Sequence, residues 1–215
     1  MPPITLYFLQ ASRCIRTAWL LEELGLNYDV KFSERENRVA PASFKQSSGN
    51  PLGKFPTLKD GDMTLYESGA ISQYLCETYD KSHQLLPTTQ PARNSVTQWV
   101  HAAEATFCMH AIGILYARWS DADAAAIEKV EARMSVNVQK DMDWLEAELN
   151  KSNGRFLMGD RVTAADCNMH FSAQFILARQ LGTGGKTWKR VQEWIDACEA
   201  TEGYKRAVQK SGYKL

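Results

Sequence analysis

The sequence predicts an α+β protein of two domains, a βαβ–ββα sheet domain followed by an all-helical domain. Two observations support this fold class. Short β-prone runs lie before residue 67, and every periodic signal beyond a polar, proline-containing stretch near residues 80–90 is helical. We therefore expect a sheet domain over residues 1–80, a linker over residues 81–90 and a helical domain over residues 91–215.

The beginning of the chain predicts a strand–helix–strand unit. Residues 4–9 form a short apolar, β-prone run, which indicates a buried strand. Ser12 starts a helix that closes at Leu24, with Gly25 as its C-cap. Apolar and polar residues alternate over residues 28–32, which indicates a second strand. Such a unit implies a right-handed crossover between parallel strands.

The next segment predicts a hairpin followed by a helix. Residues 34–49 are polar and are expected to loop around a short helical turn. Two prolines and a glycine within residues 50–56 halt any helix that arrives from upstream. Asp60-Gly61 between two β-prone runs is a strong hairpin signal. Ser68 can then cap a helix that runs to about Tyr79.

The helical domain is predicted from apolar periodicity and from capping signals. A first long helix covers about residues 92–119. A second has apolar residues spaced by threes and fours over residues 127–149, and Asn153-Gly154 stops it. A capping box at residues 163–166, with Asp in the position usually held by Glu, starts a third helix. A last helix is expected over residues 188–200.

Composition excludes several classes of function. Basic and acidic residues balance at 25 each, so no net charge favours nucleic acid or an anionic membrane surface. No apolar run is long enough to span a bilayer, and no secretory signal opens the chain. The five cysteines are scattered and lack a CxxC pair, which argues against a disulfide framework or a metal site. We expect a cytoplasmic protein.

Residues 50–58 and 66–71 hold the groups with the clearest chemistry. An extended backbone around the second proline leaves N–H and C=O groups free to pair with an extended ligand. Lys54 adds a cation and Glu67 a carboxylate, and Ser68 adds a hydroxyl at a helix start, where N–H groups bind anions. These groups suit a short zwitterionic peptide, although a hairpin with an N-capped helix explains the same pattern.

Four motifs, in this order, resemble those of the cytosolic glutathione transferases, in particular the serine-type branch of fungal and bacterial members. They are Ser12-Arg13-Cys14-Ile15-Arg16 with Trp19-Leu20-Leu21-Glu22-Glu23-Leu24-Gly25, Asn50-Pro51-Leu52-Gly53-Lys54-Phe55-Pro56, Tyr66-Glu67-Ser68-Gly69-Ala70-Ile71, and Phe156-Leu157-Met158-Gly159-Asp160 with Val162-Thr163-Ala164-Ala165-Asp166. The likeness covers essentially the whole chain. It implies a thioredoxin-like domain that binds glutathione, followed by a helical domain that holds the second substrate.

The resemblance also implies which residues bind glutathione. A cis peptide bond at Pro56 would let the backbone of Phe55 pair with the cysteinyl residue. Glu67 and Ser68 would hold the glutamyl amino and carboxylate groups, and Lys54 would lie near the glycyl end. Two other basic residues compete for the glycyl carboxylate, Arg38 and Lys45.

Three residues compete to activate the thiol. Ser12 is favoured within the resemblance, because a hydroxyl donor and a helix N-terminus both stabilise a thiolate; taken alone, it is a plain N-cap serine. Tyr7 stands where tyrosine-type members keep their hydroxyl, but its interval to Arg16 is short for that alignment. Cys14 would imply a thiol-transfer branch, although a buried inert cysteine is commoner.

The function implied is a transferase, as in detoxification, that presents glutathione as a thiolate to small hydrophobic electrophiles. Candidates for the second-substrate pocket are Tyr7, Phe107, His110 and Tyr116, although aromatic residues at helical spacing are more often core. Dimerisation is the family norm, and Glu104 either faces the neighbour's glutathione or is a surface acid. A glutathione-dependent isomerase, a peroxidase or thiol transferase, and a non-catalytic binding relative remain alternatives.

Overall fold

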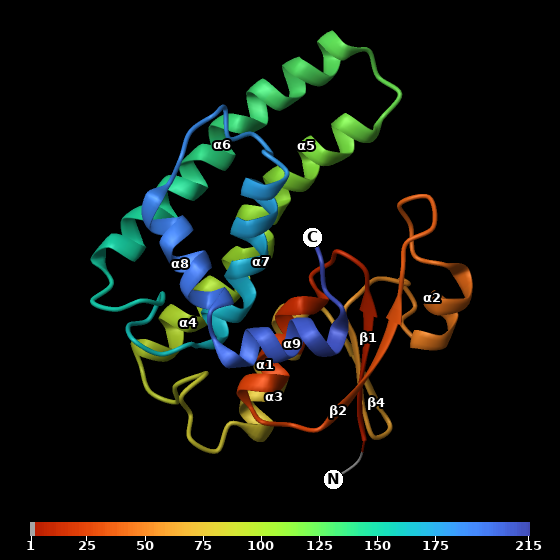
Figure 1. Ribbon diagram of the computed structural model, residues 1–215, viewed down its shortest axis with the longest axis vertical. Helices are drawn as coiled ribbons and strands as arrows, with labels where there is room; N and C mark the ends of the chain where they lie inside the picture. The colour runs from red at the N-terminus through yellow and green to blue at the C-terminus, as the bar shows by residue number, and fades with distance from the viewer. Residues whose placement is uncertain (1–2) are drawn as a thin grey trace. The chain divides into compact units, whose positions relative to one another are not determined.

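The chain folds into two compact units, Met1–Arg93 together with Glu199–Leu215, and Asn94–Cys198. A computed structural model describes residues 3–215 (Figure 1). The first unit holds a four-stranded sheet with helices, and the second is helical, which confirms the α+β fold class. The predicted division assigned the end of the chain to the helical domain, whereas residues 199–215 join the first unit.

The sheet has the strand order β2-β1-β3-β4. β1 (Ile4–Leu9) and β2 (Tyr28–Ser33) pair in parallel across α1 (Cys14–Glu23), as the predicted crossover requires. β3 (Thr57–Asp60) pairs antiparallel with β1 and with β4 (Met63–Tyr66). This register places the candidate site residues Ser12, Phe55 and Glu67 at one end of the sheet, because each of them follows or precedes a strand there.

The hairpin and the short helix before it lie close to their predicted places. Asp60 pairs with Met63, so the turn consists of Gly61 and Asp62, one residue later than the sequence signal. Gly61 has a φ of +57°, which a glycine adopts without steric cost. α2 (Ala42–Ser48) forms the helical turn expected within residues 34–49.

α1 packs against β1, α3 (Ser68–Tyr79) and α9 (Glu202–Ser211). α9 was not among the predicted helices, because it buries one aromatic ring and small residues in place of an apolar stripe. That ring belongs to Tyr204, which meets Trp19 of α1 edge-on at 5.3 Å between ring centroids. The Arg206 guanidinium donates to the Glu22 carboxylate at 2.9 Å. The predicted last helix is therefore followed by one that belongs to the sheet unit.

Between residues 92 and 199 the helices lie close to their predicted places, but the long helix predicted over residues 92–119 consists of three consecutive elements. α4 (Ala92–Ala102), the π-helical η1 (Ala103–Cys108) and α5 (Met109–Trp119) follow one another without a break. In a π-helix the backbone hydrogen bonds join residues five apart, whereas in an α-helix they join residues four apart. The carbonyl of Ala103, the first residue of η1, accepts a hydrogen bond from the Ser172 hydroxyl at 2.8 Å. The remaining helices are α6 (Ala124–Lys151), α7 (Ala164–Ala178) and α8 (Lys189–Glu199).

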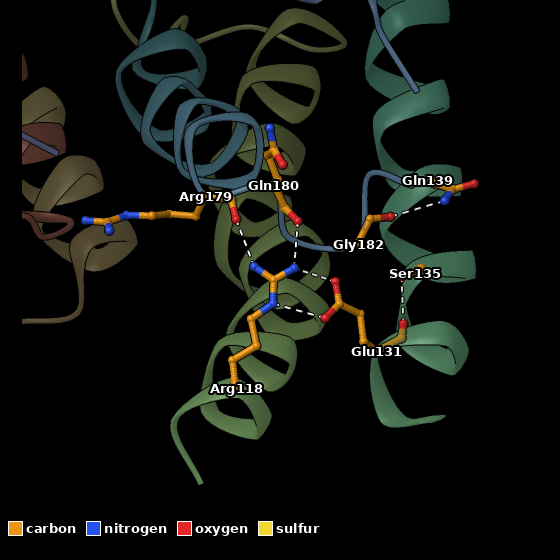
Figure 2. A network of polar contacts seen from close by, with 7 residues as sticks. All are labelled: Arg118, Glu131, Ser135, Gln139, Arg179, Gln180 and Gly182. Atoms are coloured by element: carbon orange, nitrogen blue, oxygen red, sulfur yellow. Dashed lines mark hydrogen bonds and ion pairs between the residues drawn. The ribbon is translucent and has the colours of Figure 1, made fainter. Parts of the chain in front are cut away.

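Arg118, near the end of α5, ties three helices together (Figure 2). Its guanidinium donates at 2.9 Å to the carbonyls of Arg179 and Gln180, just after α7. The same guanidinium forms an ion pair with Glu131 of α6. Helix C-termini leave carbonyls without intrahelical partners. Arg118 supplies hydrogen-bond donors to two such carbonyls after α7, and it thereby links α7 to α5 and α6.

The segment between α3 and α4 is organised by one carboxylate. Asp80 is 5% exposed, and its oxygens accept from the Ser82 hydroxyl at 2.8 Å and from the Leu85 backbone N–H at 2.7 Å. Burial opposes ionisation, but these hydrogen bonds outweigh it and lower the pKa of Asp80.

Asp80→Asn is expected to make the protein less stable at pH 7 by about 1 kcal/mol, because the amide is a weaker acceptor than the carboxylate. A lowered native pKa contributes stability above the unfolded value of about 3.9, and this stability is lost as the pH falls through the native pKa. The stability difference between wild type and Asp80→Asn, measured by urea denaturation, should therefore shrink as the pH falls below about 4. A difference independent of pH would contradict the ionised hydrogen-bonded carboxylate.

Candidate functional site

A buried asparagine fixes the conformation of the loop before β3 through its side-chain hydrogen bonds. The Asn50 side-chain amide donates to the Lys54 carbonyl at 2.8 Å and to the Thr57 hydroxyl at 3.2 Å. The Asn50 side-chain oxygen accepts from the Leu52 N–H at 2.9 Å. Sequence reasoning missed Asn50 as an organising residue, although an asparagine before a proline is a turn signal that could have found it. These bonds fix the backbone on both sides of Phe55.

Phe55 presents an unpaired stretch of backbone. The Phe55–Pro56 peptide bond is cis, as the resemblance implied. The Phe55 ring stacks on Phe44 of α2 with 4.7 Å between centroids, which anchors the side chain. Within residues 3–215, neither the N–H nor the C=O of Phe55 has a hydrogen-bond partner. This backbone is free to pair with an extended ligand.

The start of α3 offers both an anion site and a carboxylate. Ser68 was expected to cap this helix, but the N-cap position is Glu67, and no side chain caps it. The first intrahelical bond runs from the Ile71 N–H to the Glu67 carbonyl, which leaves the N–H groups of residues 68–70 available. Glu67 is exposed and has a φ of +75°, a strained conformation for a non-glycine residue.

The sheet register brings these groups together. Thr57 pairs with Tyr66 across the hairpin and with Tyr7 of β1. Because Phe55-Pro56 precede Thr57 and Glu67-Ser68 follow Tyr66, both segments lie at the same end of the sheet. β1 runs toward that end, so the loop that contains Ser12 follows there as well.

Ser12 is 6% exposed and belongs to the turn between β1 and α1. Its hydroxyl donates to the Leu9 carbonyl at 2.6 Å and accepts from the Cys14 N–H at 3.3 Å. The helix itself begins at Cys14, with Arg13 in the N-cap position. To donate to a ligand sulfur, the Ser12 hydroxyl must rotate away from Leu9.

The two competitors of Ser12 are packed inside the first unit. Cys14 is fully buried, its thiol donates to the Tyr7 carbonyl at 3.5 Å, and burial raises its pKa to about 11. A neutral, enclosed thiol is a poor nucleophile. Tyr7 is 3% exposed, and its hydroxyl accepts from the Lys59 ammonium at 3.4 Å.

The three basic residues that were candidates for the glycyl carboxylate have different environments. Lys54 is exposed and makes no ion pair in the described part of the chain. The stem of Lys45 lies against Gly53, where an added Cβ would come within 2.9 Å of it, so Lys45 flanks the loop. Arg38 has a φ of +69°, and its carbonyl accepts from the Arg35 guanidinium at 3.1 Å.

The helix predicted over residues 92–119 carries three of the candidates for the second-substrate pocket, and their environments differ. Phe107 is fully buried, with its ring centroid 6.0 Å from that of Trp144, as in a helical core. Tyr116 is 61% exposed. His110 is half-buried, and its Nδ1 lies 2.8 Å from a carboxylate oxygen of Asp141. Burial raises the pKa of Asp141, and the hydrogen bond to His110 opposes this shift.

Comparisons with known proteins identify the family of the chain. The N-terminal domain model of glutathione S-transferase matches residues 2–77, and the C-terminal domain model matches residues 105–202. The glutathione S-transferase-like protein OpS6 of Beauveria bassiana is 31% identical over 77% of this chain and 76% of its own length. The chain belongs to the glutathione S-transferase family. Glutathione S-transferase 1 of Saccharomyces cerevisiae is 26% identical over 98% of this chain and 96% of its own length.

A solved glutathione S-transferase supports the same fold. The structure of an Actinobacillus pleuropneumoniae glutathione S-transferase superimposes with a TM-score of 0.84 at 26% identity, and it covers 99% of this chain and 94% of the other. The sheet of the first unit thus belongs to the glutathione S-transferase N-terminal domain, which has a thioredoxin-like fold. No helix within residues 3–215 is long and apolar enough to cross a membrane.

Proposed function

We propose that this glutathione S-transferase binds glutathione at the end of its sheet and activates it as a thiolate for attack on small hydrophobic electrophiles. The observation that carries the proposal is the free backbone of Phe55 beside the uncapped start of α3. Glutathione is an extended peptide whose cysteinyl backbone can pair with Phe55. Its glutamyl carboxylate suits the N–H groups at the start of α3, and its glutamyl ammonium suits the Glu67 carboxylate.

Thiolate formation is assigned to Ser12, in the manner of the serine-type branch. A free thiol has a pKa of about 8.5, so only a few per cent is thiolate at pH 7. A hydroxyl that donates to sulfur favours the ionised form. The burial and raised pKa of Cys14 argue against the thiol-transfer alternative.

The proposal also covers the glycyl carboxylate, the second-substrate pocket, and the assembly and location of the protein. Lys54 or Lys45 holds the glycyl carboxylate, and His110, on the half-buried side of its helix, contributes to the second-substrate pocket. A cytoplasmic homodimer is proposed from family membership, with support from the five free cysteines, which suit a reducing compartment.

Glu67→Gln tests glutathione binding. Removing the charge that pairs with the glutamyl ammonium should raise the dissociation constant of glutathione about tenfold to a hundredfold, because hydrogen bonds to charged groups contribute about 1.5–3 kcal/mol. Calorimetric titration measures this, and Glu128→Gln, at an exposed position on α6, is the matched control. Equal affinity of the Glu67→Gln variant and the wild type would remove Glu67 from the site.

A further inference from the structure

The turn that carries Ser12 contains a strained residue. Ala11 has a φ of +46°, in the left-handed region that residues other than glycine rarely adopt. It lies between the end of β1 at Leu9 and the start of α1 at Cys14, where the chain turns from strand into helix. Because a left-handed alanine costs free energy, this conformation persists only where neighbouring contacts hold it.

Three hydrogen bonds hold Gln10, the residue before Ala11. The Gln10 N–H donates to the Ser33 carbonyl at 2.9 Å. The Gln10 carbonyl accepts from the Nε–H of Arg35 at 3.1 Å, and the Gln10 side-chain oxygen accepts from the Arg35 backbone N–H at 3.1 Å. The Arg35 guanidinium also donates to the Arg38 carbonyl at 3.1 Å, within its own loop. No prediction from the sequence gave Gln10 or Arg35 a role.

The bond to the Gln10 carbonyl acts directly on the strained residue. The angle φ of Ala11 is the rotation about the bond that follows the Gln10–Ala11 peptide group, so a contact that fixes this group restricts φ. On the other side, the Ser12 hydroxyl bonds the Leu9 carbonyl and the Cys14 N–H. Because both neighbours are held, rotation of Ala11 to an ordinary negative φ would move Ser12 relative to the end of β1.

We propose that Arg35 is a positioning residue for thiolate formation, because it holds the Gln10–Ala11 peptide group, keeps Ala11 left-handed and thereby places Ser12. The inference rests on the proposed function, in which the Ser12 hydroxyl donates to the sulfur of bound glutathione. A hydrogen bond weakens steeply when its geometry departs from the optimum. A displaced Ser12 would therefore stabilise the thiolate less.

Arg35→Met tests this role, because it keeps a long unbranched side chain and removes the donor to the Gln10 carbonyl. Turnover near neutral pH should fall about fivefold to thirtyfold, which corresponds to about 1–2 kcal/mol, the cost of a left-handed residue. The midpoint of thiolate formation by bound glutathione, followed by ultraviolet absorbance against pH, should rise by about one pH unit. The dissociation constant of glutathione should change by less than about threefold, because Phe55 and Glu67 are untouched.

Ala11→Gly supplies the deciding comparison, because glycine adopts a left-handed φ without steric cost. When Arg35→Met is added to a protein that already carries Ala11→Gly, turnover should fall by less than about threefold. An effect of Arg35 through its charge or through any other contact does not depend on strain at position 11, and it would persist in full. Arg133→Met, at an exposed position on α6, is the matched control and should change neither turnover nor midpoint.

If Arg35→Met leaves the midpoint unchanged, or shifts it equally with and without Ala11→Gly, the inference is overturned while the proposed function stands. If Ser12→Ala leaves the midpoint at its wild-type value, the Ser12 assignment in the proposed function fails and the inference with it. Should Arg35→Met not fold, Gln10→Met, which removes the acceptor of the Arg35 backbone N–H, takes its place and should raise the midpoint. An unchanged midpoint in Gln10→Met then overturns the inference.

Discussion

Replacing Asp166 with alanine is expected to lower the free energy of unfolding by about 3–5 kcal/mol, because it strands several buried donors at once. Asp166 is fully buried. One carboxylate oxygen accepts from the Leu157 N–H at 2.9 Å and the Trp194 indole N–H at 3.0 Å. The other accepts from the backbone N–H and the hydroxyl of Thr163, at 2.9 and 3.0 Å, which completes the predicted capping box.

This cost exceeds that of an ordinary helix cap, which is about 0.5–2 kcal/mol. Burial raises the pKa of Asp166, and the hydrogen bonds from Leu157, Trp194 and Thr163 oppose this shift. Urea denaturation of Asp166→Ala measures the loss. Asp160→Ala, at an exposed aspartate six residues earlier, is the matched control and should change stability by less than about 0.5 kcal/mol. An unchanged midpoint together with lost glutathione binding would show that Asp166 is not the structural centre of this segment.

Replacing Ser12 with alanine is expected to reduce turnover near neutral pH by about one to two orders of magnitude, while glutathione affinity changes much less. A hydrogen bond to a charged sulfur contributes about 1.5–3 kcal/mol, which corresponds to roughly one to two pKa units of the bound thiol. The binding groups at Phe55 and Glu67 are untouched by the substitution. Steady-state kinetics with an aryl halide and glutathione separates kcat from KM.

Ser12 also has a structural part, because its hydroxyl bonds the Leu9 carbonyl and the Cys14 N–H. Ser12→Thr keeps a hydroxyl and should retain part of the activity. Cys14→Ala and Tyr7→Phe should leave thiolate formation near normal, since both side chains are buried in packing contacts. If either of these variants abolishes thiolate formation while Ser12→Ala does not, the mechanism belongs to that residue.

The sheet and most helices were predictable because their signals are local. Alternation over residues 28–32, the hairpin signal at Asp60-Gly61 and the capping box at residues 163–166 each depend on a few neighbouring residues. α9 was not predictable by the same means. Its main anchor is Tyr204 on Trp19 of α1, a contact between the two ends of the chain that no local pattern shows.

The sequence predicted the candidate ligand-binding residues of the site, but it did not predict the residues that hold them in place. Phe55, Glu67 and Ser68 were found because proline, glycine and a helix start mark the segments that hold them. Arg35 and Asn50 were missed as supporting residues, since an arginine and an asparagine in loops are ordinary on the surface. Their importance comes from bonds to other residues of the fold, 25 positions away for Arg35.

The most direct test of the account is a pH titration of the ultraviolet absorbance of thiolate, with glutathione bound to the purified protein. The wild type is expected to form the thiolate with a midpoint about one to two pH units below the value of about 8.5 for a free thiol. In Ser12→Ala the midpoint should return toward 8.5, while in Cys14→Ala it stays with the wild type. Bound glutathione that titrates in the wild type at the free-thiol value would contradict the account.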